Sequence, residues 1–157
     1  MRTKPGRAVL ALTILFLLVN GRSCAACDVS QGPPVTMPKD DAAADVVVRA
    51  YLAAVAARDP DVARALSTPS YHRRFHGWLN DPINTWADVK VSKVGRPISD
   101  TYGPGGYRQV QRVHVDVEIR RCSEEPPDDD RHYPYSFLVG RQADDAPWRI
   151  LEFGGAG

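Results

Sequence analysis

The sequence has almost no net charge: 20 lysines and arginines stand against 19 aspartates and glutamates in 157 residues. It also lacks the G-x-G-x-x-G and P-loop fingerprints of nucleotide binding and the G-x-S-x-G turn of a serine nucleophile. Residues 1–26 hold four of the basic residues and no acid, so the rest of the chain carries 16 basic and 19 acidic residues, a net −3. A chain of that charge has no electrostatic footprint for nucleic acid.

A long hydrophobic run is missing as well. The uncharged apolar stretch Ala8–Val19 spans about 18 Å as a helix, short of the roughly 30 Å hydrocarbon core of a bilayer. Three basic residues precede this stretch, and the small residues Ser23–Cys27 follow it. That order predicts a cleaved secretory signal peptide over residues 1–26. An uncleaved signal anchor is the alternative.

Cysteine is scarce, with three residues, and an odd number is unusual for an exported protein. The stretch Cys24-Ala25-Ala26-Cys27 resembles the lipobox of bacterial lipoproteins, although Cys24 stands where that motif usually has leucine. The resemblance implies a lipid on Cys27 and a protein anchored at the outer face of the cell membrane. The alternative is cleavage after Ala25 or Ala26 and a secreted protein. Lipidation leaves Cys122 as a free thiol, whereas an unmodified Cys27 allows a Cys27–Cys122 disulfide.

The chain after residue 26 divides into a short tether and one domain. Residues 27–40 are rich in proline and have no apolar period, which predicts a flexible tether before a domain over residues 41–157. A helix is predicted from Asp41 to Arg58, with Asp40 or Asp41 as its cap. Its apolar stripe consists of Val47, Ala50, Tyr51, Ala54 and Val55.

Two further helices are expected to begin at Asp59-Pro60 and Thr68-Pro69, because each pair offers a side-chain acceptor followed by a proline that fits the first helical position. The expected buried positions are Val62, Ala65 and Leu66 in the first of these helices, and Tyr71, Phe75, Trp78 and Leu79 in the second.

After Asp81-Pro82 the apolar period changes from 3.6 to 2, which predicts strands. A first strand is expected over Trp86–Val94 and a last one over Trp148–Phe153. Between them lie two alternating series, Val113, Val115, Val117 and Ile119, then Tyr133, Tyr135, Phe137 and Val139. Helices followed by antiparallel strands predict an α+β fold, with N-terminal helices packed on a curved antiparallel sheet.

This order resembles the NTF2-like (SnoaL-like) superfamily. The matching residues are the opening helix Val47–Val55 with Tyr51, the break Ala57–Asp61, and the C-terminal strand around Trp148-Arg149-Ile150. The resemblance implies a cone with a pocket between sheet and helices. It does not select an activity, because that superfamily includes isomerases and dehydratases as well as non-catalytic ligand-binding and partner-binding domains.

The candidate chemical groups each have a simpler interpretation as surface features. His72 and His76 have a metal-ligand spacing, but Arg73 stands where the protease helix pattern needs glutamate. His114, Asp116 and Glu118 share the solvent-facing side of a strand whose other side is aliphatic. The acids of residues 124–130 are split by two prolines, and nothing in the sequence places a base beside Cys122. We therefore expect no catalytic residue, metal site or cofactor.

Aromatic side chains remain as candidates for lining a pocket. They are Tyr51, Phe75, Trp78, Tyr135, Phe137 and Trp148. The sequence favours a non-catalytic envelope domain that binds a partner protein or a small apolar ligand. The alternatives are a SnoaL-like isomerase or hydrolyase that acts on a hydrophobic substrate, and a purely structural accessory domain. An ionisable residue inside the cone would favour the enzyme.

Overall fold

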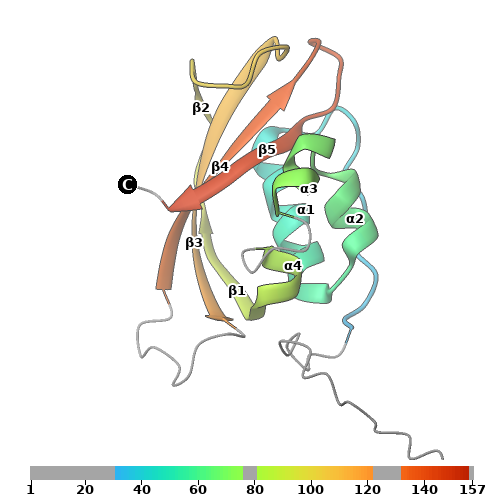
Figure 1. The fold of residues 1–157 in the computed structure, drawn as a ribbon, viewed down its shortest axis with the longest axis vertical. Coiled ribbons are helices and arrows are strands. Elements are labelled where there is room, and N and C mark those ends of the chain that lie inside the picture. Colours follow the sequence, from blue (N-terminus) through green and yellow to red (C-terminus); the bar gives the residue numbers. More distant parts are fainter. Residues whose placement is uncertain (1–30, 76–80, 122–131, 156–157) are drawn as a thin grey trace, which may run out of the picture.

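The computed structural model describes residues 31–75, 81–121 and 132–155. Four helices come first and five antiparallel strands follow, and the helices lie against one face of the sheet (Figure 1). This confirms the predicted α+β class. None of the described helices has the length and apolar character needed to cross a membrane. The elements are α1 (Ala44–Ala57), α2 (Pro60–Ala65), α3 (Pro69–Phe75), α4 (Pro82–Thr85), β1 (Trp86–Val94), β2 (Ile98–Ser99), β3 (Gln109–Arg121), β4 (His132–Arg141) and β5 (Arg149–Gly155).

Helix α1 buries the predicted stripe except for Ala50, which is partly buried against the core, but the helix begins later than predicted. A turn closed by the Ala42 N–H and the Lys39 carbonyl precedes the helix, so its N-cap is Ala43, which has no side-chain acceptor. The prediction that an aspartate at 40 or 41 caps the helix is therefore wrong. The buried residues are Ala44, Val47, Val48, Tyr51, Leu52, Ala54, Val55 and Ala57.

The proline-led helices begin where the sequence indicates. The Asp59 carboxylate accepts from the Val62 N–H at 3.1 Å, and the Thr68 hydroxyl accepts from the Tyr71 N–H at 3.2 Å. The predicted burial of Ala65 is wrong, because α2 turns Ala63 inward and leaves Ala65 exposed. Asp81-Pro82 begins α4, a single turn that the change of apolar period had not indicated.

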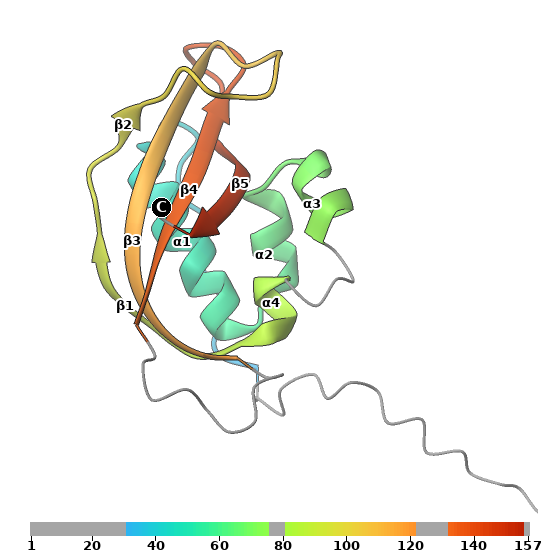
Figure 2. The same cartoon turned by 60° about the vertical axis from the view of Figure 1, so that its left-hand side comes forward.

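The sheet has the strand order β1-β3-β4-β5, and the short β2 pairs with β3. It curves around the helices (Figure 2). On β3 the four aliphatic residues of the alternating series are at most 2% exposed, which confirms the predicted phase of this strand. On β4, Tyr135, Phe137 and Val139 face the core as expected.

The outer face of β4 is also partly covered. Leu138 and Gly140 are buried, and a Cβ atom added at Gly140 would lie 2.7 Å from Leu151 and 2.8 Å from the ring of Tyr107. Glycine is needed at this position because these two side chains fill the space beside the strand. A small second cluster therefore packs on the side of the sheet that faces away from the helices.

The segment before α1 is held against the domain. The Gly32 N–H donates to the Ala57 carbonyl at 2.8 Å, and the Val35 N–H donates to the Asp59 carboxylate at 3.3 Å. Val35 also packs against the core cluster. The predicted tether over residues 27–40 thus includes a part that contacts the end of α1, while its first residues lie outside those described.

Candidate functional site

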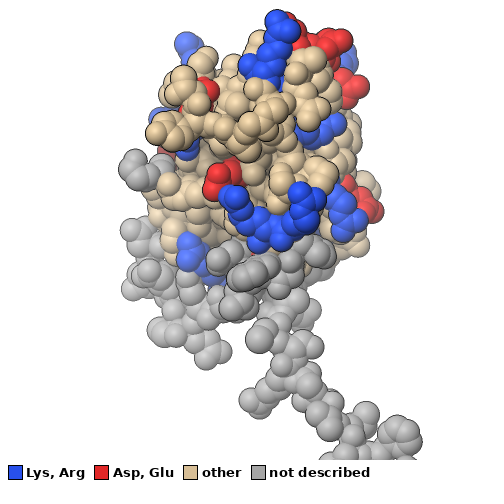
Figure 3. Space-filling view, turned by 45° about the horizontal axis from the view of Figure 1, so that its top comes forward, with Lys and Arg blue, Asp and Glu red and all other residues tan. Residues whose placement is uncertain are grey.

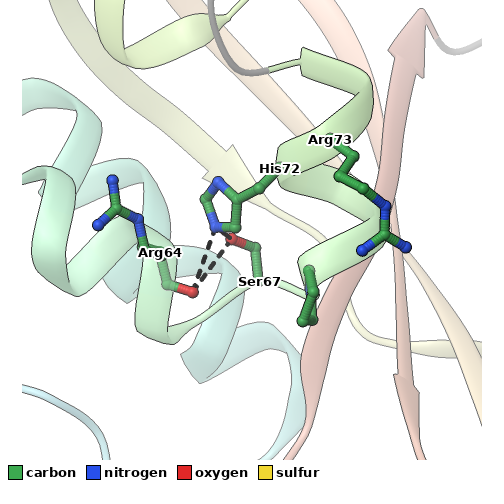
Figure 4. A pocket seen from close by; sticks show the side chains of 5 residues that line it. Arg64, Ser67, His72 and Arg73 are labelled. Carbon is green, nitrogen blue, oxygen red and sulfur yellow. Dashed lines mark hydrogen bonds between the residues drawn. The ribbon is translucent and has the colours of Figure 1, made fainter.

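A groove lies between α2 and α3 (Figure 4). Its volume is about 590 Å³, within the range of roughly 300–1,000 Å³ that is typical of small-molecule pockets. The lining residues are Arg64, Ser67, Pro69, His72 and Arg73. The groove is formed by the two short helices and the connection between them.

The connection is fixed by β5. The Thr68 N–H donates to the Ile150 carbonyl at 3.0 Å, and the Ile150 N–H donates to the Leu66 carbonyl at 2.9 Å. These bonds add residues 66–68 to the edge of the sheet, next to β5, as a short parallel bridge. Because the edge of a sheet is rigid, the base of the groove has a defined position relative to the core.

Ser67 and His72 form a hydrogen-bonded pair in the groove. Ser67 Oγ lies 2.8 Å from His72 Nε2 and 2.7 Å from the Ala63 carbonyl, and the same histidine nitrogen lies 3.3 Å from the Arg64 carbonyl. A carbonyl oxygen only accepts. The Ala63 carbonyl accepts from the Ser67 hydroxyl, and the Arg64 carbonyl also accepts from the Ser67 N–H at 3.3 Å. When His72 carries its proton on Nε2, it donates to the serine oxygen and to the Arg64 carbonyl.

This arrangement closes the C-terminal end of α2, where unpaired carbonyls need donors. With a proton on Nε2 of His72, the Ser67 proton points to the Ala63 carbonyl, whereas a catalytic serine must donate its proton to the histidine. The pair therefore has the geometry of a helix cap rather than that of a nucleophile and its base.

Two arginines flank this pair. Arg64 and Arg73 are exposed, and within the described part of the chain neither forms an ion pair or a side-chain hydrogen bond. Arg74 differs, because its guanidinium bonds the Glu152 carboxylate at 2.9 Å. Figure 3 shows basic side chains gathered in a band on one face of the molecule. Arg64 and Arg73 therefore bring positive charge to the groove without an ion pair to any described acid.

A second cavity of about 90 Å³ lies further inside and shares Arg64 and His72 with the groove. It is also lined by Tyr51 and Tyr71, whose hydroxyl oxygens are 2.6 Å apart. Burial raises the pKa of both phenols, so both hydroxyls stay protonated at neutral pH. Neither tyrosine is therefore available as a base.

Asp81 also lines this inner cavity and is buried. One oxygen of its carboxylate accepts from the Ile83 N–H at 3.2 Å, and the other accepts from the Asn84 side-chain amide at 3.1 Å. Both oxygens are therefore used in starting α4. Asp81 is thus an ionisable residue inside the fold, where it caps α4, and sequence reasoning did not single it out.

Four of the predicted pocket residues belong to one aromatic cluster in the core. Phe75, Tyr135 and Phe137 each contact Phe153, with ring centroids 5.0, 5.8 and 5.9 Å apart. Tyr51 contacts Phe137 at 5.8 Å and also lines the inner cavity. Trp148 lies under the Arg141 guanidinium at 4.8 Å. Of the described residues in this set, only Tyr51 lines either of the two cavities above. Trp78, His76, Cys27, Cys122 and the acidic residues 124–130 lie outside the described residues.

The outward residues of β3 are where the alternation predicts them. His114 and Asp116 are exposed, and Glu118 bonds Lys90 at 3.8 Å and His132 at 3.3 Å. Across the described ranges 31–75, 81–121 and 132–155, no group of three or more His, Cys, Asp or Glu side chains is placed to hold a metal ion.

Sequence reasoning missed four residues of the groove: Arg64, Ser67, Pro69 and Arg73. The only available signal was the Thr68-Pro69 break, which indicated two short helices with a tight connection. A groove between such helices depends on their crossing geometry, which a one-dimensional pattern does not contain.

Comparisons with protein-family models, with curated proteins and with solved structures found no match. The class that the structure defines is an α+β domain with N-terminal helices packed on an antiparallel sheet.

Proposed function

We propose that this protein is a non-catalytic binding domain of the bacterial cell envelope, and that the groove between α2 and α3 is its binding site. The observation that carries the proposal is a groove of small-molecule size in which Arg64 and Arg73 have no acidic partner among the described residues. In a concave binding site the apolar walls hold the ligand, and a few charged side chains determine which ligand binds.

The absence of a catalytic role is supported by how the nearby polar groups are used. Ser67 and His72 close α2, Asp81 starts α4, and the phenols of Tyr51 and Tyr71 bond each other. A general base must accept a proton from a bound substrate, and each of these groups already takes part in a local hydrogen bond. The inner cavity, at about 90 Å³, is also far below the usual size of a substrate pocket.

The cellular setting is part of the proposal. The basic start, the apolar run and the CAAC stretch support export and a lipid on Cys27, with secretion of a soluble form as the alternative. The order of helices before strands and the curved sheet support membership of the NTF2-like superfamily (Figure 2). A partner protein of the envelope is an alternative occupant of the groove.

A second candidate function is a SnoaL-like isomerase or hydrolyase. It is favoured by one observation, the presence of Tyr51, Tyr71, His72 and Asp81 around a single interior cavity. A protonated tyrosine pair beside a carboxylate is able to hold the oxygen of a carbonyl substrate. The site would have to widen before a substrate of ordinary size could enter.

Incubation with hydrophobic ketones and epoxides separates the two functions. Residues 28–157 contain every described helix and strand, so we would use this chain. The binding proposal expects no product from the wild type. Turnover that is lost in Tyr71→Phe and His72→Ala, and kept in the outward-facing control His114→Ala, would establish the enzyme and defeat the binding proposal.

A further inference from the structure

The two arginines of the groove come from different helices. Arg64 lies on α2 and Arg73 on α3, and Figure 4 shows them on opposite sides of the Ser67–His72 pair. Since neither has an acidic partner in the described part of the chain, each is available to an external anion. A guanidinium is suited to this role because its planar set of donors matches the oxygens of a carboxylate or a phosphate.

Below the charged groups the groove offers little further hydrogen bonding. Ser67 and His72 direct their donors to the carbonyls at the end of α2. Pro69 contributes an apolar ring and no N–H. The arginines add the aliphatic stems of their side chains. A ligand that fills the groove therefore meets apolar surface except at its charged end.

The size and the openness of the site limit the ligand further. A volume of about 590 Å³ is far larger than a bare inorganic anion needs, and it is in the range for small organic ligands. From charge, surface and size together, we propose that the groove binds a small amphiphilic anion, namely a single carboxylate on an apolar chain. This inference rests on the proposed binding function and names its ligand class.

The test is calorimetric titration of residues 28–157 with decanoate below its micelle concentration. Decanol and decyltrimethylammonium are matched probes with the same chain and a neutral or positive head. Acetate is a probe with the same head and no chain. The proposal expects decanoate to bind at least about tenfold more tightly than any of the three, because only decanoate offers both a carboxylate for the arginine side chains and an apolar chain for the walls.

Variants connect this binding to the groove. The double change Arg64→Gln and Arg73→Gln is expected to weaken decanoate binding about tenfold. Arg74→Gln is the control, since it removes one arginine that adjoins Arg73 on α3 and lies outside the groove, and it is expected to change the affinity less than about twofold. Because all three residues are exposed, circular dichroism spectra should stay unchanged.

Four results would overturn the inference. They are no binding of decanoate, equal binding of decanol, equal binding of acetate, and an equal loss in Arg74→Gln and in the double variant. Binding of decanol that survives the loss of both arginines would reject the anionic ligand and keep the binding function. Turnover of the ketones or epoxides would instead reject the binding function itself.

Discussion

Val117 and Glu118 are neighbours in β3 that face opposite sides of the sheet. Val117 is fully buried, whereas Glu118 is partly exposed and pairs with Lys90 and His132. Val117→Asp is expected to lower the free energy of unfolding by about 3 kcal/mol or more, because it buries a carboxylate without a partner. Glu118→Ala is expected to cost only about 0.5 kcal/mol, because surface ion pairs contribute little.

Chemical denaturation of the two variants measures this difference. If Glu118→Ala is the more destabilised protein, the strand is out of phase with the structure, and the assignment of the core face of the sheet is wrong.

At the residue scale the sequence predicted burial well and polar contacts poorly. The alternation of Val113 to Ile119 identified the core face, because a strand repeats every two residues and one face is apolar. The same kind of reasoning placed His72 on the surface as an isolated side chain. Its contacts with Ser67 and Arg64 arise where one helix ends beside the start of the next, and no spacing rule in the sequence describes that meeting.

Helix α2 depends on one side chain that serves two segments. Asp59 accepts from the Val62 N–H at the start of α2 and from the Val35 N–H in the segment before α1. Asp59→Ala is expected to lower the free energy of unfolding by about 1–2 kcal/mol, the usual cost of losing a cap. It is also expected to increase protease cleavage near Val35, because that segment loses one of its attachments.

Asp61→Ala is the matched control, since Asp61 is exposed in the first turn of the same helix. It is expected to cost less than about 0.5 kcal/mol. Equal losses in the two variants would show that the helix responds to acidic charge near its start, and that the capping bond has no separate contribution.

At the scale of elements, the start signals located most helices and strands. Asp59-Pro60 and Thr68-Pro69 marked α2 and α3, and the change of period marked β1 at Trp86. The single-turn helix α4 and the two-residue β2 were missed, because such short elements have no periodicity to detect. The start of α1 was misplaced because the turn at residues 39–42 uses a backbone bond, which any sequence can form.

The export proposal concerns the whole molecule and is directly testable at the N-terminus. Mass spectrometry of the mature protein from a bacterial host is expected to find Cys27 as the first residue, carrying a lipid. The same digest is expected to contain Cys122 as a free thiol, because lipidation leaves it no cysteine partner.

A mature chain with an unmodified N-terminus at Ala26, Cys27 or Asp28 would reject the anchor. A peptide that joins Cys27 to Cys122 by a disulfide would reject it independently and would favour the secreted form. A variant with Cys27→Ala serves as the control for the lipid mass and for release from the membrane fraction.

The bond between Gly32 and Ala57 determines how far the domain can move from such an anchor. Gly32 lies five positions after Cys27, and five residue steps of fully extended chain reach about 17 Å. The near side of a domain held by a lipid at Cys27 would therefore stay within about that distance of the membrane surface. An amphiphile that leaves the bilayer would pass this layer before it reaches the rest of the compartment. The anchor would then shorten the time in which the groove meets such molecules, while the affinity of the groove stays the same.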